Sequence, residues 1–229
     1  MVYNLDRLYP DPADSLNTPL RMQYRNQLRL KRLVLIAFGT VILIVWPLFT
    51  GRSVLPPILL AAAVGFQFYS RPLPGSRFRL KDLTGIKSLF LPAFIAMILV
   101  IWPILETGEK FSWLDVIIFT WCFLVLSINS LVFDLRDMTG DRLYGTPTIP
   151  ARLGGRLTTI LLLVLGASMV FLSGSLGLPG DLPRTLPLAL ASVHLLIIVA
   201  IQCRARPIIL SLLADLLLLT PAFSIGLLR

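Results

Sequence analysis

Long apolar runs constrain the fold of this chain more than any other feature of its sequence. Seven of them follow one another through its 229 residues. They cover residues 31–49, 53–70, 86–105, 113–133, 157–177, 184–202 and 207–228. Each is close to the ~17–25 residues that an α-helix needs to cross a bilayer. Hydrocarbon offers no water to backbone amides, and the runs lack sustained alternation, so they predict an all-α, polytopic membrane helix bundle with about seven spans.

Basic residues are unevenly distributed between the two ends of these runs. One side collects four basic stretches, at residues 7–32, 71–87, 136–156 and 204–206. The other side holds only Arg52, Lys110, Arg184 and Arg229. Because Lys and Arg accumulate in cytoplasmic loops, the pattern predicts a cytoplasmic N-terminus and an outer C-terminus. Topology and lipid headgroups then explain the net charge of +9, and nucleic acid is not expected as a partner.

Three carboxylates and two guanidiniums follow the fourth run directly. They are Asp134, Asp137, Asp141, Arg136 and Arg142. The spacing keeps the three acids within about 60° of one another if the helix continues through them. Charges at a hydrocarbon boundary are costly unless paired or bound, so the cluster predicts a cation site or an ion-pair network with the arginines. The glycines and prolines from Gly140 to Gly154 predict the end of the helix and a turn.

A second group of acids and amides lies in the N-terminal segment, ahead of the first run. Its members are Asn4, Asp6, Asp11, Asp14, Asn17 and Arg21. The charge pattern places this group on the same side of the membrane as the first cluster. Oxygen-rich clusters with basic neighbours suit Mg²⁺ and a substrate diphosphate. The alternative is an ordinary polar tail whose acids are solvated.

The sequence from Asp134 to Gly154 resembles the second aspartate-rich motif of the UbiA superfamily of intramembrane prenyltransferases. It reads Asp-x-x-Asp-x-x-x-Asp-Arg-x-x-Gly-x-x-Thr-x-Pro-x-x-x-Gly. The N-terminal segment resembles the family's first motif, which typically reads Asn-Asp-x-x-Asp-x-x-x-Asp. The latter half of that motif is matched by Asp14, Asn17, Pro19 and Arg21. Asn4 and Asp6 take the earlier positions with altered spacing, and Leu5 stands where the family usually has Asp.

This resemblance covers the whole chain and implies one prenyltransferase domain over residues 1–229. Members of the family usually have nine transmembrane helices, and their first motif follows the second helix. Here the corresponding motif stands at the N-terminus. The resemblance therefore implies a domain that is truncated at its N-terminus by two helices.

The resemblance also implies a chemistry, in which Mg²⁺ ions bridge an isoprenyl diphosphate and the protein. The residues expected to hold the ions are Asp6, Asp14, Asp134, Asp137 and Asp141, the last three being catalytic. The residues expected to bind the diphosphate are Asn4, Asp6, Asp14, Asn17, Arg21, Lys87, Arg136 and Arg142. Lys87 resembles a basic position of the family; its alternative is a lysine that snorkels to the headgroups. The expected acceptor is a small lipophilic molecule, commonly an aromatic ring or a precursor of a quinone or pigment.

Two other functions stay open on the sequence. The first is a non-catalytic membrane protein that keeps the UbiA-like fold without two of its helices. A small transporter would need acids in the middle of its spans, and only Asp215 is placed so. Each of these proteins would be a multi-pass integral membrane protein, in the plasma membrane if the host is bacterial.

Overall fold

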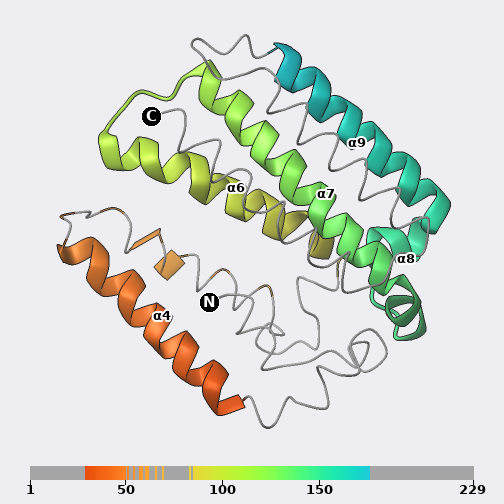
Figure 1. The fold of residues 1–229 in the computed structure, drawn as a ribbon, viewed down its shortest axis with the longest axis horizontal. Helices are drawn as coiled ribbons and strands as arrows, with labels where there is room; N and C mark the ends of the chain where they lie inside the picture. The colour runs from red at the N-terminus through yellow and green to blue at the C-terminus, as the bar shows by residue number, and fades with distance from the viewer. Residues whose placement is uncertain are drawn as a thin grey trace.

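The computed structural model describes two continuous stretches of the chain, residues 29–49 and 85–175. It also describes isolated positions between them, at residues 51, 54, 57, 58, 60, 61, 65, 69 and 83. The helices in these stretches are α4, α6, α7, α8 and α9 (Figure 1). The predicted runs at 184–202 and 207–228, and most of the run at 53–70, lie outside the described residues.

Helix α4 spans Arg29–Phe49 and confirms the helix expected over residues 31–49. Its apolar side chains are largely exposed, among them Leu30, Val34, Phe38 and Phe49. A water-soluble helix buries such side chains on one face, whereas a helix in hydrocarbon can leave them facing lipid. The exposure of α4 is therefore the pattern of a membrane helix.

Helices α6 and α7 form an antiparallel pair, joined by a short turn. α6 spans Ile86–Thr107 and α7 spans Trp113–Leu143. α7 begins at a capping box, in which Asp115 N donates to Ser112 Oγ at 3.4 Å and Ser112 N donates to Asp115 Oδ2 at 2.7 Å. Ser88–Thr107 within α6, and all of α7, are long and apolar enough to cross a membrane.

Two further helices complete the described part of the bundle. α8 is a single short helix, Ile149–Leu153, and α9 spans Gly155–Ser175. α7 lies between α6 and α9, and α8 packs against the end of α7 and the start of α9 (Figure 1). The runs predicted at 86–105, 113–133 and 157–177 are thus confirmed as helices. Gly155–Met169 and Leu33–Ile42 are apolar helices shorter than the span length.

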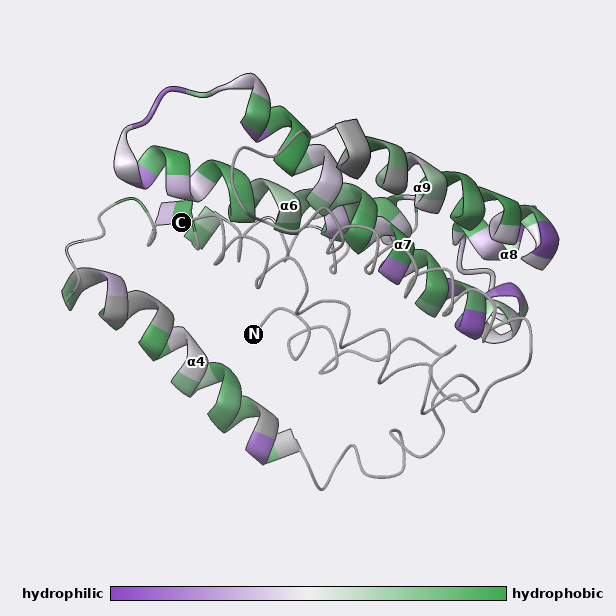
Figure 2. Ribbon diagram, turned by 45° about the horizontal axis from the view of Figure 1, so that its top comes forward, coloured by the Kyte–Doolittle hydropathy of each residue, from purple (hydrophilic) through white to green (hydrophobic). Residues whose placement is uncertain are grey.

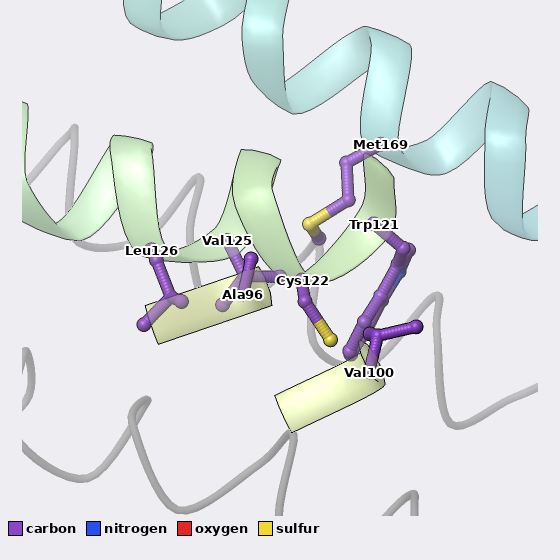
Figure 3. Close-up of a cluster of buried hydrophobic side chains, with 7 residues drawn as sticks. All are labelled: Ala96, Val100, Trp121, Cys122, Val125, Leu126 and Met169. Carbon is purple, nitrogen blue, oxygen red and sulfur yellow. The ribbon is translucent and has the colours of Figure 1, made fainter. Parts of the chain in front are cut away.

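The core of the bundle lies along α7 in two clusters of buried side chains. The first joins α7 to α6 and α9 through Ala96, Val100, Trp121, Cys122, Val125, Leu126 and Met169. Figure 3 shows Met169 reaching from α9 into this cluster. The second cluster joins α7 to α9 through Ile128, Leu131, Val132 and Leu162. Leu135 and Ile149 also pack against the second cluster, so the apolar packing reaches the acidic sequence that begins at Asp134.

Hydrophilic residues gather at one end of this bundle and in the α6–α7 turn at the other end (Figure 2). The first of these ends contains the start of α6, the end of α7, all of α8 and the start of α9 (Figure 1). The middle of each helix is apolar. This arrangement agrees with the predicted alternation of sides for the described helices.

The structure confirms the predicted end of the fourth helix and adds a short helix after it. The helix ends at Leu143, inside the predicted range from Gly140 to Gly154, and Gly140 itself is buried inside α7. The turn comes at Gly145, whose φ of 71° belongs to the left-handed region that favours glycine. α8 was not expected: Thr148 caps its start, its hydroxyl accepting from Ala151 N at 3.3 Å, and Pro150 lies in its first turn.

Candidate active site

Two of the three predicted acids are buried on one face of α7. Asp134 is 7% exposed and Asp141 is 1% exposed. Seven residues of helix advance by about 10.5 Å and bring the side chain back to within about 20° of its starting direction. Asp137 lies about 60° away from Asp134, and its side chain is 22% exposed. The acids therefore form a stripe along α7, with Asp137 at its edge.

The start of α6 contacts Asp134 through a buried serine. Ser88 Oγ donates a hydrogen bond to Asp134 Oδ2, and Ser88 is fully buried. The bond joins residues 46 positions apart, so no local sequence pattern predicted it. Pro92 lies inside α6 four residues after Ser88 and cannot donate to the Ser88 carbonyl. The hydroxyl of Ser88 thus holds one oxygen of the Asp134 carboxylate in place.

A glycine lets α6 begin at this position. Gly85 has a φ of 77°, and its N–H donates to the Pro147 carbonyl at 3.4 Å. A Cβ at residue 85 would stand 3.6 Å from Ile149 Cγ1, which is ordinary contact, so the positive φ is what requires glycine. The α7–α8 turn thus anchors the start of α6, and this anchor sets the position of Ser88.

Asp137 is paired with its neighbour Arg136. Arg136 Nε lies 2.7 Å from Asp137 Oδ1, and Arg136 Nη2 lies 2.8 Å from Asp137 Oδ2. The same guanidinium lies over the Phe133 ring, at 5.0 Å from the ring centroid. This pair is the ion-pair network that the sequence left open as an alternative for the acids.

Arg142 holds α8 against the end of α7. Its Nε donates to the Ala151 carbonyl at 3.0 Å, and its side chain is exposed. A Cβ at Gly154 would come within 3.3 Å of Arg142 Nη2, so glycine there leaves room for the guanidinium. Arg142, which is predicted to bind the diphosphate, therefore also makes a structural contact next to the buried Asp141.

Lys87 lies in the first turn of α6, next to Ser88 and at the same end of the bundle as the acids. Its side chain is outside the part that the structure describes. The predicted residues of the first motif, Asn4, Asp6, Asp14, Asn17 and Arg21, lie outside it too, as does Asp215. The structure therefore brings together the second motif and the start of α6.

The described carboxylates do not converge on a single point. Within residues 29–49 and 85–175, no three side chains of His, Cys, Asp or Glu stand close enough together to hold a metal ion. Asp137 bonds to Arg136, and Asp134 and Asp141 are separated by two helical turns. A cation bound between all three acids, which the spacing suggested, therefore stays a prediction. Carboxylate oxygens are nevertheless the ligands that Mg²⁺ prefers, and the two buried ones fit that ion as partial ligand sets.

These features define a class of protein: an integral membrane protein of apolar helices that carries buried carboxylates at one end. The comparison with family models gives the family, because the model of the UbiA prenyltransferase family matches residues 4–207. The chain belongs to this family, and the resemblance read from its two motifs is confirmed. No curated protein and no solved structure matches the chain. Membership implies prenyltransferase activity within a membrane.

Proposed function

We propose that this protein transfers an isoprenyl group from an isoprenyl diphosphate to an aromatic acceptor, or to a precursor of a quinone or pigment, with Mg²⁺ as cofactor. One observation carries the proposal: Asp134 and Asp141 are buried on one face of α7, at the polar end of an apolar bundle. A buried carboxylate is costly unless it meets a cation or a donor. Such a pair is suited to binding metal and diphosphate next to a lipid-soluble chain.

The proposed reaction breaks one bond and forms another. The C1–O bond of the isoprenyl diphosphate breaks, and its electron pair leaves with the diphosphate. The allylic carbon is attacked by a ring carbon of the acceptor, and the proton of that ring carbon passes to solvent or to the departed diphosphate. Bound Mg²⁺ would supply positive charge to the leaving diphosphate oxygens. The residues proposed to hold it are Asp6, Asp14, Asp134, Asp137 and Asp141.

Basic side chains would neutralise the remaining charge of the diphosphate. Those proposed are Arg21, Lys87, Arg136 and Arg142, with Asn4 and Asn17 as hydrogen-bonding partners. Arg136 would have to share its contact with Asp137, and partly exposed ion pairs are weak enough for a diphosphate to compete. Arg142 donates to the Ala151 carbonyl through Nε, and a guanidinium has four further N–H donors that can bind a diphosphate.

The apolar middle of the helices suits the isoprenyl chain of the donor. An isoprenyl chain gains free energy when it leaves water, and the middle of the bundle is apolar. We propose the full topology read from the sequence with it: about seven spans, a cytoplasmic N-terminus, an outer C-terminus and, in a bacterial host, the plasma membrane. The site then faces the cytoplasm, where diphosphates are made.

A transfer assay on the full chain tests this function. The purified protein in lipid nanodiscs would be offered isoprenyl diphosphates of several lengths, phenolic acceptors and Mg²⁺. We expect a prenylated acceptor that depends on Mg²⁺ and disappears in Asp134→Asn, while Glu109→Gln in the exposed turn at the other end stays active. No product from any donor and acceptor pair would favour a non-catalytic UbiA-like protein instead.

A further inference from the structure

A hydroxyl in the middle of α7 lacks the partner that other helical hydroxyls have. Ser127 is 1% exposed, and its Oγ has no hydrogen-bond partner in the part of the chain that the structure describes. Elsewhere the hydroxyls of Thr40, Thr120, Thr158, Thr159 and Ser168 donate to the carbonyl four residues earlier, at 2.7–2.9 Å. Burying a hydroxyl without a bond costs free energy, so Ser127 requires an explanation.

Ser127 lies on the face of α7 that carries the buried acids. It precedes Asp134 by seven residues and Asp141 by fourteen, and each step of seven turns the helix by only about 20°. Asn129 also has a buried, unpartnered Oδ1, but it lies about 200° around the helix from Ser127. Of these two side chains, Ser127 alone continues the acidic stripe into the apolar span.

The distance between Ser127 and Asp134 fits the size of an acceptor ring. The axial separation is about 10.5 Å. A diphosphate at the acids places its allylic carbon a few ångströms further into the bundle, and an attacking ring carbon stands about 3–3.5 Å beyond that carbon. An oxygen substituent makes a ring electron-rich enough to attack, and in such an acceptor this oxygen then falls at the depth of Ser127.

We infer that Ser127 hydrogen-bonds the ring oxygen of a phenolic or quinol acceptor and so selects oxygen-bearing rings. The inference rests on the proposed function for the identity of the reaction, and on the orphaned hydroxyl for the residue. Ser127 is a specificity residue in this account. The described part of the fold leaves this hydroxyl unbonded because its partner arrives with the acceptor, which lowers stability in favour of binding.

Binding of two matched probes tests this inference without the transfer reaction. The full chain in lipid nanodiscs would be dialysed against 1-naphthol or naphthalene, which differ by one oxygen, and uptake by empty nanodiscs would be subtracted. We expect wild type to prefer 1-naphthol by between about twofold and tenfold, the range of one hydrogen bond. Ser127→Ala should abolish this preference. Ser168→Ala on α9, whose hydroxyl bonds to the Val164 carbonyl at 2.9 Å, is the matched control and should keep it.

Thermal unfolding gives a second, independent readout. Removing an unbonded buried hydroxyl should leave the Tm of Ser127→Ala equal to or above that of wild type, whereas removing a structural bond would lower it. A lowered Tm, a wild type without preference for 1-naphthol, or a preference that survives Ser127→Ala would each overturn the inference. Preference without prenyl transfer would overturn the proposed function alone, and transfer with unchanged preference in Ser127→Ala would overturn the inference alone.

Discussion

The two ends of the α6–α7 pair carry acids in different environments. At the α6–α7 turn, Asp115 is half-buried and bonds to Ser112 three residues away, and the half-buried Glu106 accepts from Trp102 Nε1 at 3.1 Å, four residues away. At the other end, Asp134 and Asp141 are buried, and Asp134 bonds to Ser88 on a different helix. Half-buried acids with local partners complete the ends of helices. Two buried acids on one face of a helix are costly to remove from water, and we propose that they are kept for binding.

The largest effect is expected when one acid at each end is neutralised. We expect Asp134→Asn to lower prenyl transfer by at least about a hundredfold, because it removes a charge from the proposed metal and diphosphate site. Glu109→Gln at the exposed turn should leave the rate within a factor of about two, since it changes only a solvated charge. Steady-state transfer rates at saturating Mg²⁺ measure both. Equal losses at the two ends would contradict the assignment of the site to one end.

A second comparison ranks the acids within the stripe. Asp141→Asn should reduce transfer nearly as much as Asp134→Asn, because both carboxylates are buried on the same face. Asp137→Asn should cost less, on the order of tenfold, because its carboxylate is partly exposed and paired with Arg136. The measurement is kcat/KM for the diphosphate donor. A loss at Asp137 larger than at Asp141 would show that burial does not order their contributions.

A third test asks whether Ser88 acts through Asp134. Ser88→Ala should raise the Mg²⁺ concentration needed for half-maximal rate by about 10-fold to 100-fold, as changes behind metal ligands commonly do. The rate at saturating Mg²⁺ should recover most of its wild-type value. Ser88→Thr, which keeps the hydroxyl, should need less Mg²⁺ than Ser88→Ala. A rate loss that added Mg²⁺ does not restore would assign Ser88 to packing alone.

The smallest effect on prenyl transfer is expected at the α6–α7 turn. Ser112→Ala removes the cap of α7 and should lower the free energy of unfolding by about 1 kcal/mol. Prenyl transfer at a temperature below the unfolding transition should not change. The measurement is a Tm beside an initial rate for the same preparation. An altered Mg²⁺ dependence in this variant would mean that the two ends are coupled.

Hydropathy and motif spacing predicted the features that depend on neighbouring residues. Four of the predicted apolar runs are helices in the described part of the chain, and the motif from Asp134 to Gly154 identified the family. The end of α7 at Leu143 falls within the predicted range from Gly140 to Gly154, because Gly145 supplies the positive φ of the turn.

Contacts between segments that are distant in the chain could not be predicted from the sequence. Ser88 carries no motif, and its bond to Asp134 exists only because Gly85 anchors α6 on the α7–α8 turn. The pairing of Arg136 with Asp137 was foreseen only as an alternative, since sequence spacing allows the arginine to face either its neighbour or a ligand. The unbonded state of Ser127 depends on which donors and acceptors surround it, and periodicity alone contains no such information.

The length of α7 sets the depth at which a substrate would be met. Its 31 residues extend for about 46 Å, whereas the hydrocarbon layer is about 30 Å thick. If its first turn stands at the outer boundary, its last ten residues, which include Asp134 and Asp141, emerge at the level of the lipid headgroups. In the proposed orientation, an isoprenyl diphosphate in the inner leaflet would carry its diphosphate at this same depth. This donor could then enter the site laterally from the membrane, while its isoprenyl chain stays in hydrocarbon and its diphosphate stays in water.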